Sequence, residues 1–124
     1  AEEPTGDNKP ILFIDVPSGV PEEARRFVEM GAQSLQCRQM APALDAYRKA
    51  REILEGESAM SSSTGGTVMA GIGTTRMLQG ELEEATQAFQ AARGIYEELN
   101  LLESDEGLGT LVSLGNVWVQ RKQH

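Results

Sequence analysis

The chain has 124 residues, a length that suits one domain with a single modest core. Leu, Ala, Gln and Glu are abundant and aromatic residues make up only 5% of the chain, so we expect an all-α fold and not a sandwich or barrel. The net charge of −8 argues against binding to nucleic acid, and no apolar run approaches the ~20 residues of a membrane span, so at most peripheral association with a membrane is expected.

The first 20 residues differ in kind from the rest. Ala1–Pro10 is acidic and rich in turn residues, and Pro17 ends a β-prone run that follows it. A lone strand has no sheet to join, so we expect an extended N-terminal arm that contacts either the helical part of its own chain or another chain. The expected contact residues of this arm are Ile11, Leu12, Phe13, Ile14 and Val16. Ala instead of Met at position 1 fits a processed precursor, so an organelle interior such as a plastid lumen is expected, with the cytoplasm as the alternative.

Two helices are predicted after the arm. Pro21 and the two carboxylates behind it suit the opening turn of the first helix, which should run to about Cys37. Arg38–Ala41 is predicted as a turn, Pro42 as part of the first turn of the second helix, and Gly56 as its left-handed closing residue. Cys37 has no second cysteine to pair with, and we interpret it as a small core residue.

The middle of the chain is predicted to hold a long loop and two further helices. Ser58–Gly66 is rich in Ser and Gly, which offer little to bury and much backbone freedom, so this segment is predicted as a loop. A third helix is expected over about Thr67–Leu78, Gly80 turns the chain, and a fourth helix covers Glu81–Leu99. Gly94 costs that helix about 1 kcal/mol relative to Ala, which predicts a close contact at this position.

The last predicted helix spans about Glu106–Lys122. Asn100 is expected to end the preceding helix, and Ser104 is expected to cap the last one. No partner helix follows it in the sequence, so it should act as the cap of a stack of helices. Trp118, with a valine on either side, leaves this helix apolar on more than one side, and we predict that Trp118 contacts something that covers it.

A repeat of 42 residues runs through these segments, because Gly31, Gly73 and Gly115 are spaced at that interval. The same register aligns Ala43 with Ala85, Tyr47 with Phe89, Ala50 with Ala92, and Ile53 with Ile95. Small residues are needed where two helices cross closely, since a larger side chain would push the axes beyond the ~8–10 Å of tight packing. We therefore expect each of the three glycines to lie at a close crossing, in helical hairpins that bury a core by stacking.

The repeated positions follow a family signature in two halves. Its pattern is large–x–x–large–Gly–x–x–large followed by Ala–x–x–x–aromatic, and the residues that fit it are Leu111, Leu114, Gly115, Trp118, Ala85 and Phe89. This pattern resembles the tetratricopeptide repeat (TPR). Ser34 and Arg76 stand where a large aromatic residue is usual, Glu55 and Glu97 replace the usual closing proline, and the period is 42 instead of about 34 residues. The sequence is therefore similar to a long-period variety of this family.

The resemblance implies a short right-handed α-solenoid of about five helices, made of two helical hairpins and a terminal capping helix behind the arm. Residues 1–20 would form the arm and residues 21–124 the helical-repeat domain. Within that domain the repeats would cover about 24–57 and 66–99, with a half-repeat at 108–122.

In the family that this sequence resembles, the first helix of each hairpin lines a concave groove that takes an extended peptide or a helix of a partner. Carried onto this chain by helical spacing, the groove-lining residues are Val28, Ala32, Leu35, Ala70, Thr74, Met77, Val112, Asn116 and Val119. Only Arg25 and Arg76 lie nearby and they are not clustered, so we predict an apolar partner segment and not a terminal carboxylate. The alternative for each of these positions is simple packing between helices.

The sequence offers no set of residues suited to catalysis. His124 is the only histidine in the sequence, so neither a His-assisted nucleophile nor an imidazole metal site is expected within one chain. Gly71 and Gly73 lack the third glycine and the lysine of a nucleotide-binding loop. The glutamates around Glu81 and Glu97 lack the ligand spacing of a calcium loop. We therefore expect no enzymatic activity, no metal ion and no cofactor.

The resulting hypothesis is a noncatalytic protein–protein interaction scaffold, or a small accessory subunit of a multi-subunit protein complex, that binds its partner through the groove and the arm. Its acidic charge fits a basic protein partner, and it equally fits ordinary protection against aggregation. One alternative is a regulatory module or fragment of a larger enzyme. Another is a self-associating structural protein, in which Ile11–Val16 of one copy enters the groove of the next, so homo-oligomers are possible.

Overall fold

Five helices make up most of the described chain. The computed structural model describes residues 20–123, and its helices are α1 (Glu22–Gln36), α2 (Met40–Gly56), α3 (Ser63–Leu78), α4 (Leu82–Glu98) and α5 (Asp105–Lys122). No strand occurs within residues 20–123, so the predicted all-α class with about five helices is confirmed for this part of the chain. The arm residues Ile11–Val16 lie outside the described residues.

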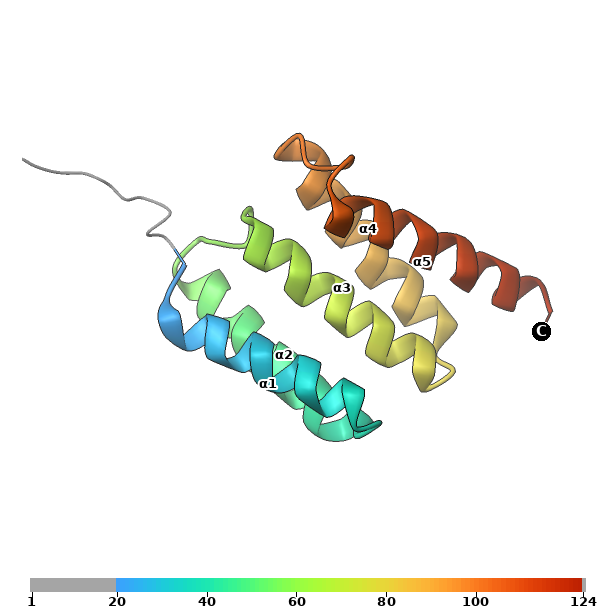
Figure 1. The fold of residues 1–124 in the computed structure, drawn as a ribbon, viewed down its shortest axis with the longest axis horizontal. Helices are drawn as coiled ribbons and strands as arrows, with labels where there is room; N and C mark the ends of the chain where they lie inside the picture. The colour runs from blue at the N-terminus through green and yellow to red at the C-terminus, as the bar shows by residue number, and fades with distance from the viewer. Residues whose placement is uncertain (1–19, 124) are drawn as a thin grey trace, which may run out of the picture.

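The helices pack as two hairpins followed by a single helix (Figure 1). Helix α1 packs on α2, and α3 packs on α4, while α2 contacts α3 and α4 contacts α5. Helix α3 also contacts α1 and α5, whereas α2 and α4 do not touch each other within the described residues. As a result α1, α3 and α5 form one layer, and α2 and α4 lie behind it in Figure 1.

The backbone turns repeat at the 42-residue interval. Within residues 20–123, four residues have positive φ, and they fall into two pairs at equivalent positions. Arg38 (φ 60°) and Gly80 (φ 82°) lie between the two helices of each hairpin, and Ser58 (φ 55°) and Asn100 (φ 59°) lie between one hairpin and the next helix. The predicted turn at Gly80 and the helix end at Asn100 are confirmed. Gly56 is the last residue of α2 and has no positive φ, so its predicted closing role is wrong, and Ser58 adopts that conformation instead.

Helices α3 and α5 are capped in the same way. The Ser62 hydroxyl accepts a hydrogen bond from the Gly65 amide (3.0 Å) at the start of α3, and the Ser104 hydroxyl accepts one from the Gly107 amide (3.1 Å) at the start of α5. Each serine satisfies one of the amide groups that a helix N-terminus leaves unpaired. The predicted cap at Ser104 is confirmed, and Ser62 is its equivalent one repeat earlier.

Each hairpin places an aromatic ring on a glycine of its first helix. A Cβ atom added to Gly31 would lie 2.8 Å from the ring of Tyr47, and one added to Gly73 would lie 2.8 Å from the ring of Phe89. Both distances are shorter than a carbon contact allows, so only glycine fits beneath these rings. The expected close crossing is present at Gly31 and Gly73. Tyr47 also lies against Gly71, so its ring contacts both hairpins.

A second pair of positions shows that the two hairpins compensate for size. In the first hairpin the buried residues Ala24 and Leu54 belong to one core cluster. At the equivalent positions of the second hairpin, the ring of Tyr96 lies so close to Gly66 that a Cβ there would be only 2.6 Å away. The larger aromatic residue is thus matched by the smaller glycine, which conserves the volume between the helices.

Two other glycines do not lie at the close crossings that the sequence predicted. Gly115 is exposed, and an added Cβ would meet nothing within 4 Å. Gly94 likewise has nothing within 4 Å of such an atom, so the close contact predicted there is wrong. Gly115 occupies the same repeat position as Gly31 and Gly73, but no described helix covers its side of α5.

Helix α3 begins at Ser63, four residues before the predicted start at Thr67. The last four residues of the loop predicted over Ser58–Gly66 are therefore helical, and the loop is shorter than expected. Gly65 and Gly66 are buried because neighbouring groups lie where their side chains would be. Helix α2 also begins early, at Met40, with Pro42 inside its first turn, where a missing amide hydrogen costs nothing. Cys37 is exposed at the end of α1, so its predicted place in the core is wrong.

Candidate partner-binding groove

The nine predicted groove residues all lie on α1, α3 and α5, the three helices of one layer. They occupy three positions of the repeat, and each position recurs in all three helices. The exposed members are Ala32, Val112, Asn116 and Val119. The partly buried members are Val28, Leu35, Ala70, Thr74 and Met77.

Four of the partly buried residues also contribute to the helix core. Val28 and Leu35 pack against the core cluster of the first hairpin, and Ala70 and Met77 pack against the cluster shared by α4 and α5. The side chains at these positions therefore pack between helices, which is the alternative that the sequence left open for them. The exposed members, on α1 and α5, are free of such core contacts.

Two hollows lie along this layer, one at each junction between neighbouring helices. The first, of about 220 Å³, lies between α1 and α3 and is lined by Arg25, Val28, Glu29, Thr64 and Thr67. The second, of about 250 Å³, lies between α3 and α5 and receives residues of α4 at its base. Val28 in the first hollow corresponds by the repeat to Ala70 in the second, and Thr67 borders both. The two hollows therefore occupy equivalent positions of the repeat.

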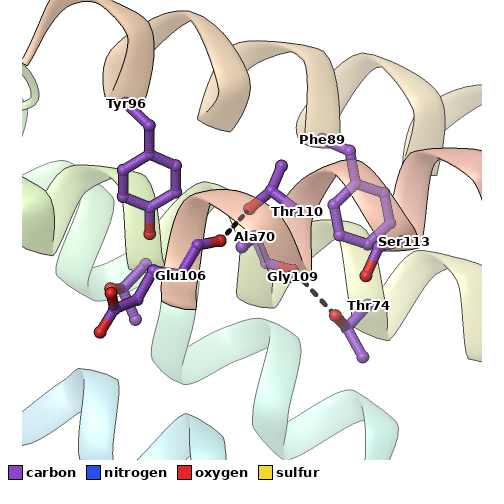
Figure 2. Close-up of a pocket in the computed structure, with 9 residues that line it drawn as sticks. Ala70, Thr74, Phe89, Tyr96, Glu106, Gly109, Thr110 and Ser113 are labelled. Atoms are coloured by element: carbon purple, nitrogen blue, oxygen red, sulfur yellow. Dashed lines mark hydrogen bonds between the residues drawn. The ribbon is translucent and has the colours of Figure 1, made fainter. Parts of the chain in front are cut away.

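Figure 2 shows the second hollow. The rings of Phe89 and Tyr96 enter it from α4, Ala70 and Thr74 border it from α3, and α5 contributes the remaining wall. That wall consists of Glu106, Gly109, Thr110 and Ser113. The floor of the hollow is aromatic, and its rim carries one carboxylate.

The threonine hydroxyls of the hollow are bonded within their own helices. Thr74 donates to the Ala70 carbonyl (3.0 Å), and Thr110 donates to the Glu106 carbonyl (2.9 Å), as the dashed lines in Figure 2 show. A hydroxyl held in this way presents its methyl group to the hollow and is not poised for proton transfer. These threonines therefore behave as small apolar surfaces.

Among the groups that line the second hollow, the phenol of Tyr96 has a shifted pKa. Burial raises the pKa of Tyr96, and the negative charge of Glu106 raises it further, while the Thr67 hydroxyl acts in the opposite direction. The phenol stays protonated at neutral pH and can donate a hydrogen bond. Tyr96 and Glu106 thus give an otherwise apolar hollow one donor and one acceptor.

Only Val28, Ala70 and Thr74 of the nine predicted groove residues line the two hollows, and the other six, like Trp118, line neither of them. Arg25 borders the first hollow, but the guanidinium of Arg76 pairs with Glu81 at the turn between α3 and α4. Trp118 lies on α5 and is 54% exposed. Thr67, Tyr96 and the other α4 and α5 residues of the second hollow were not predicted from the sequence. Thr67 follows Arg25 by one repeat, and that spacing is the signal that could have identified it.

Within residues 20–123, no group of three or more His, Cys, Asp or Glu side chains is arranged to hold a metal ion. None of the helices in the same part of the chain combines the length and the apolar character that crossing a lipid bilayer requires. Comparison with protein-family models, with curated protein sequences and with solved structures finds no match to this chain.

Proposed function

We propose that this chain is a noncatalytic protein–protein interaction module with a short TPR-like solenoid architecture, serving as a scaffold or small accessory subunit of a protein complex. Its groove, lined by α1, α3 and α5, would hold an extended partner segment with apolar side chains. The observation that carries this proposal is the pair of hollows at equivalent repeat positions on one layer of helices.

The architecture proposed here is supported by the recurrence of three independent features at the 42-residue interval. These features are the left-handed turn residues, the serine caps of α3 and α5, and the aromatic rings that lie on Gly31 and Gly73. A chain in which turns, caps and core contacts all recur is built from stacked units, and stacked helical units create extended binding surfaces.

The chemistry of the hollows supports recognition over catalysis. An activated nucleophile needs a base within hydrogen-bond reach. In the second hollow the hydroxyls of Thr74 and Thr110 are bonded to carbonyls of their own helices, and the phenol of Tyr96 has a raised pKa. Apolar walls with a few fixed polar groups are typical of sites that bind ligands.

The proposal is tested with peptides selected against the immobilised chain from a random display library. We expect selected peptides to be rich in apolar residues and to bind to the groove. Ala32→Arg and Asn116→Arg, at exposed groove positions of α1 and α5, should each weaken binding by about tenfold or more. Gln90→Arg, at an exposed position of α4, is the matched control and should bind like the unaltered chain.

Nuclear magnetic resonance shifts on α1, α3 and α5 would show where the selected peptide binds. The groove is refuted as the binding surface if Gln90→Arg weakens peptide binding as much as the two groove variants do. It is also refuted if the shifts fall on α2 and α4.

A further inference from the structure

Helix α5 carries an apolar stripe that no described residue covers. Leu108, Leu111, Gly115 and Trp118 form this open face of α5, and Leu108 and Trp118 are 48% and 54% exposed. Their spacing of three and four residues places them on one side of the helix. Leu114 and Val117, on the adjoining side of the helix that faces α4, are buried.

The equivalent faces of α1 and α3 are both covered by an antiparallel helix. Gly115 corresponds to Gly31, which lies under the ring of Tyr47 of α2, and to Gly73, which lies under the ring of Phe89 of α4. This part of the fold is thus built to receive a second helix at close range. On α5 the glycine that permits such an approach is present and open to solvent.

Among the described residues, α1 at the opposite end of the molecule offers a mostly polar surface, in which Met30 is the exposed large apolar residue. Helix α3 packs on the preceding hairpin through Val68, Gly71 and Thr75, which are buried. The equivalent residues of α1 are Arg26, Glu29 and Gln33, and all three are exposed. Stacking α5 of one copy on α1 of the next would bury these polar groups without partners, which costs free energy. A closed pairing of two α5 helices avoids this cost.

The charges at the ends of α5 favour an antiparallel copy of itself. In this structure, basic residues in a last helical turn pair with acidic residues at the start of an antiparallel neighbour, as Arg76 does with Glu81 and Arg121 with Glu83 (3.0 Å). Helix α5 begins with Asp105 and Glu106 and ends with Arg121 and Lys122. Arg121 is already paired with Glu83, and Glu106 lies in the wall of the second hollow, so Asp105 and Lys122 are the terminal charges available to a second copy. Two antiparallel α5 helices would place the Asp105 end of each beside the Lys122 end of the other.

We propose that the open face of α5 binds the same face of a second copy of this chain, with a two-fold axis close to Gly115. The α5 helix of each copy then covers the α5 helix of the other copy, in the way that α2 covers α1. The two glycines meet at the crossing, and the apolar residues on either side of them, including Trp118, become buried in the interface. This pairing lies beside the partner-binding groove and does not depend on it, so the two proposals stand or fall separately.

The first experiment measures the mass and tryptophan emission of the chain over a range of concentrations. Sedimentation velocity should show a two-chain species that dissociates on dilution. Trp118 is the only tryptophan, so its emission reports this face alone and should shift to longer wavelength as the dimer dissociates. A one-chain mass at every concentration overturns the proposal, and so does a dimer whose Trp118 emission stays that of an exposed indole.

Two substitutions on the open face should weaken the dimer and leave the fold intact. Gly115→Leu adds a side chain where nothing lies within 4 Å in one chain, and Trp118→Glu replaces an exposed ring by a charge. Each should raise the dissociation constant by about 30-fold or more. Leu78→Glu, at an exposed apolar residue of α3, is the matched control and should dimerise normally. Circular dichroism should show the same helix content in all three variants.

A cysteine substitution tests the position of the axis. In a Cys37→Ser background, Gly115→Cys should form a disulfide between two chains under mild oxidation, because the two residues meet at the crossing. Gly94→Cys on α4 is the control and should remain reduced. Cross-linking at residue 94 but not at residue 115, or a dimer that survives both Gly115→Leu and Trp118→Glu unchanged, shows that the chains pair through another surface and refutes the proposal.

Discussion

The contact between Gly73 and the ring of Phe89 makes a sharp prediction about stability. Changing glycine to alanine inside a helix normally stabilises a protein by about 0.5–1 kcal/mol, because alanine loses less backbone freedom on folding. Gly94→Ala should give this gain, since its new Cβ meets nothing within 4 Å. Gly73→Ala places a Cβ 2.8 Å from the Phe89 ring, and Phe89 is only 1% exposed, so this buried ring must shift from its packed position to admit the new methyl group.

Overpacking of this kind costs about 1–3 kcal/mol, which exceeds the gain in helix propensity. We therefore expect Gly73→Ala to lower the free energy of unfolding by about 1–2 kcal/mol while Gly94→Ala raises it. Urea denaturation followed by circular dichroism measures both. Combining Gly73→Ala with Phe89→Leu should cost less than the sum of the single changes, because the smaller side chain admits the new methyl group. Equal stabilisation by Gly73→Ala and Gly94→Ala would refute the reasoning.

Three further predictions concern the caps, the buried phenols and the thiol. Ser62→Ala and Ser104→Ala should each lower the free energy of unfolding by about 1 kcal/mol in urea denaturation, because each removes a helix cap, and an unchanged midpoint in both would contradict the capping role. Burial raises the pKa of Tyr47 and of Tyr96, so the folded state prefers the neutral forms of both phenols. The stability that follows from this preference is fully present below pH about 10 and is lost as the pH rises through the raised pKa values. Unfolding measured against pH should show this decline, and the Tyr47→Phe and Tyr96→Phe variants should show less of it. Cys37 is exposed and should react with a thiol reagent without denaturant at the rate of an unfolded control peptide, whereas strong protection would contradict its position.

The repeat made most of the helical layout predictable, because equivalent glycines and aromatic residues 42 positions apart imply equivalent helices. Local composition was misleading where the reason for a residue lies in a distant part of the chain. Gly66 suggested a flexible loop, yet it is helical and buried because the ring of Tyr96, thirty residues later, fills the space of its side chain. Gly94 suggested a close contact, yet nothing approaches it. The sequence alone does not show which glycines have another helix packed against them.

The position of the nine expected groove residues in the fold was predictable to a similar degree. Helical spacing placed the nine expected residues on three helices of one layer, because the first helices of the hairpins keep a constant register. The second hollow also depends on Tyr96 and Phe89, which reach it from α4, behind that layer. A pattern read along one helix does not contain side chains that arrive from another, so the floor of the second hollow required the structure.

The ring of Tyr47 has a consequence for how the molecule unfolds. It touches Gly31 in its own hairpin and Gly71 in the next, and Phe89 similarly belongs to a cluster that includes Leu114 of α5. Unravelling one unit therefore removes part of the support of its neighbour. A chain joined in this way should melt in one cooperative transition instead of fraying unit by unit from an end, despite an architecture in which each segment touches only those beside it.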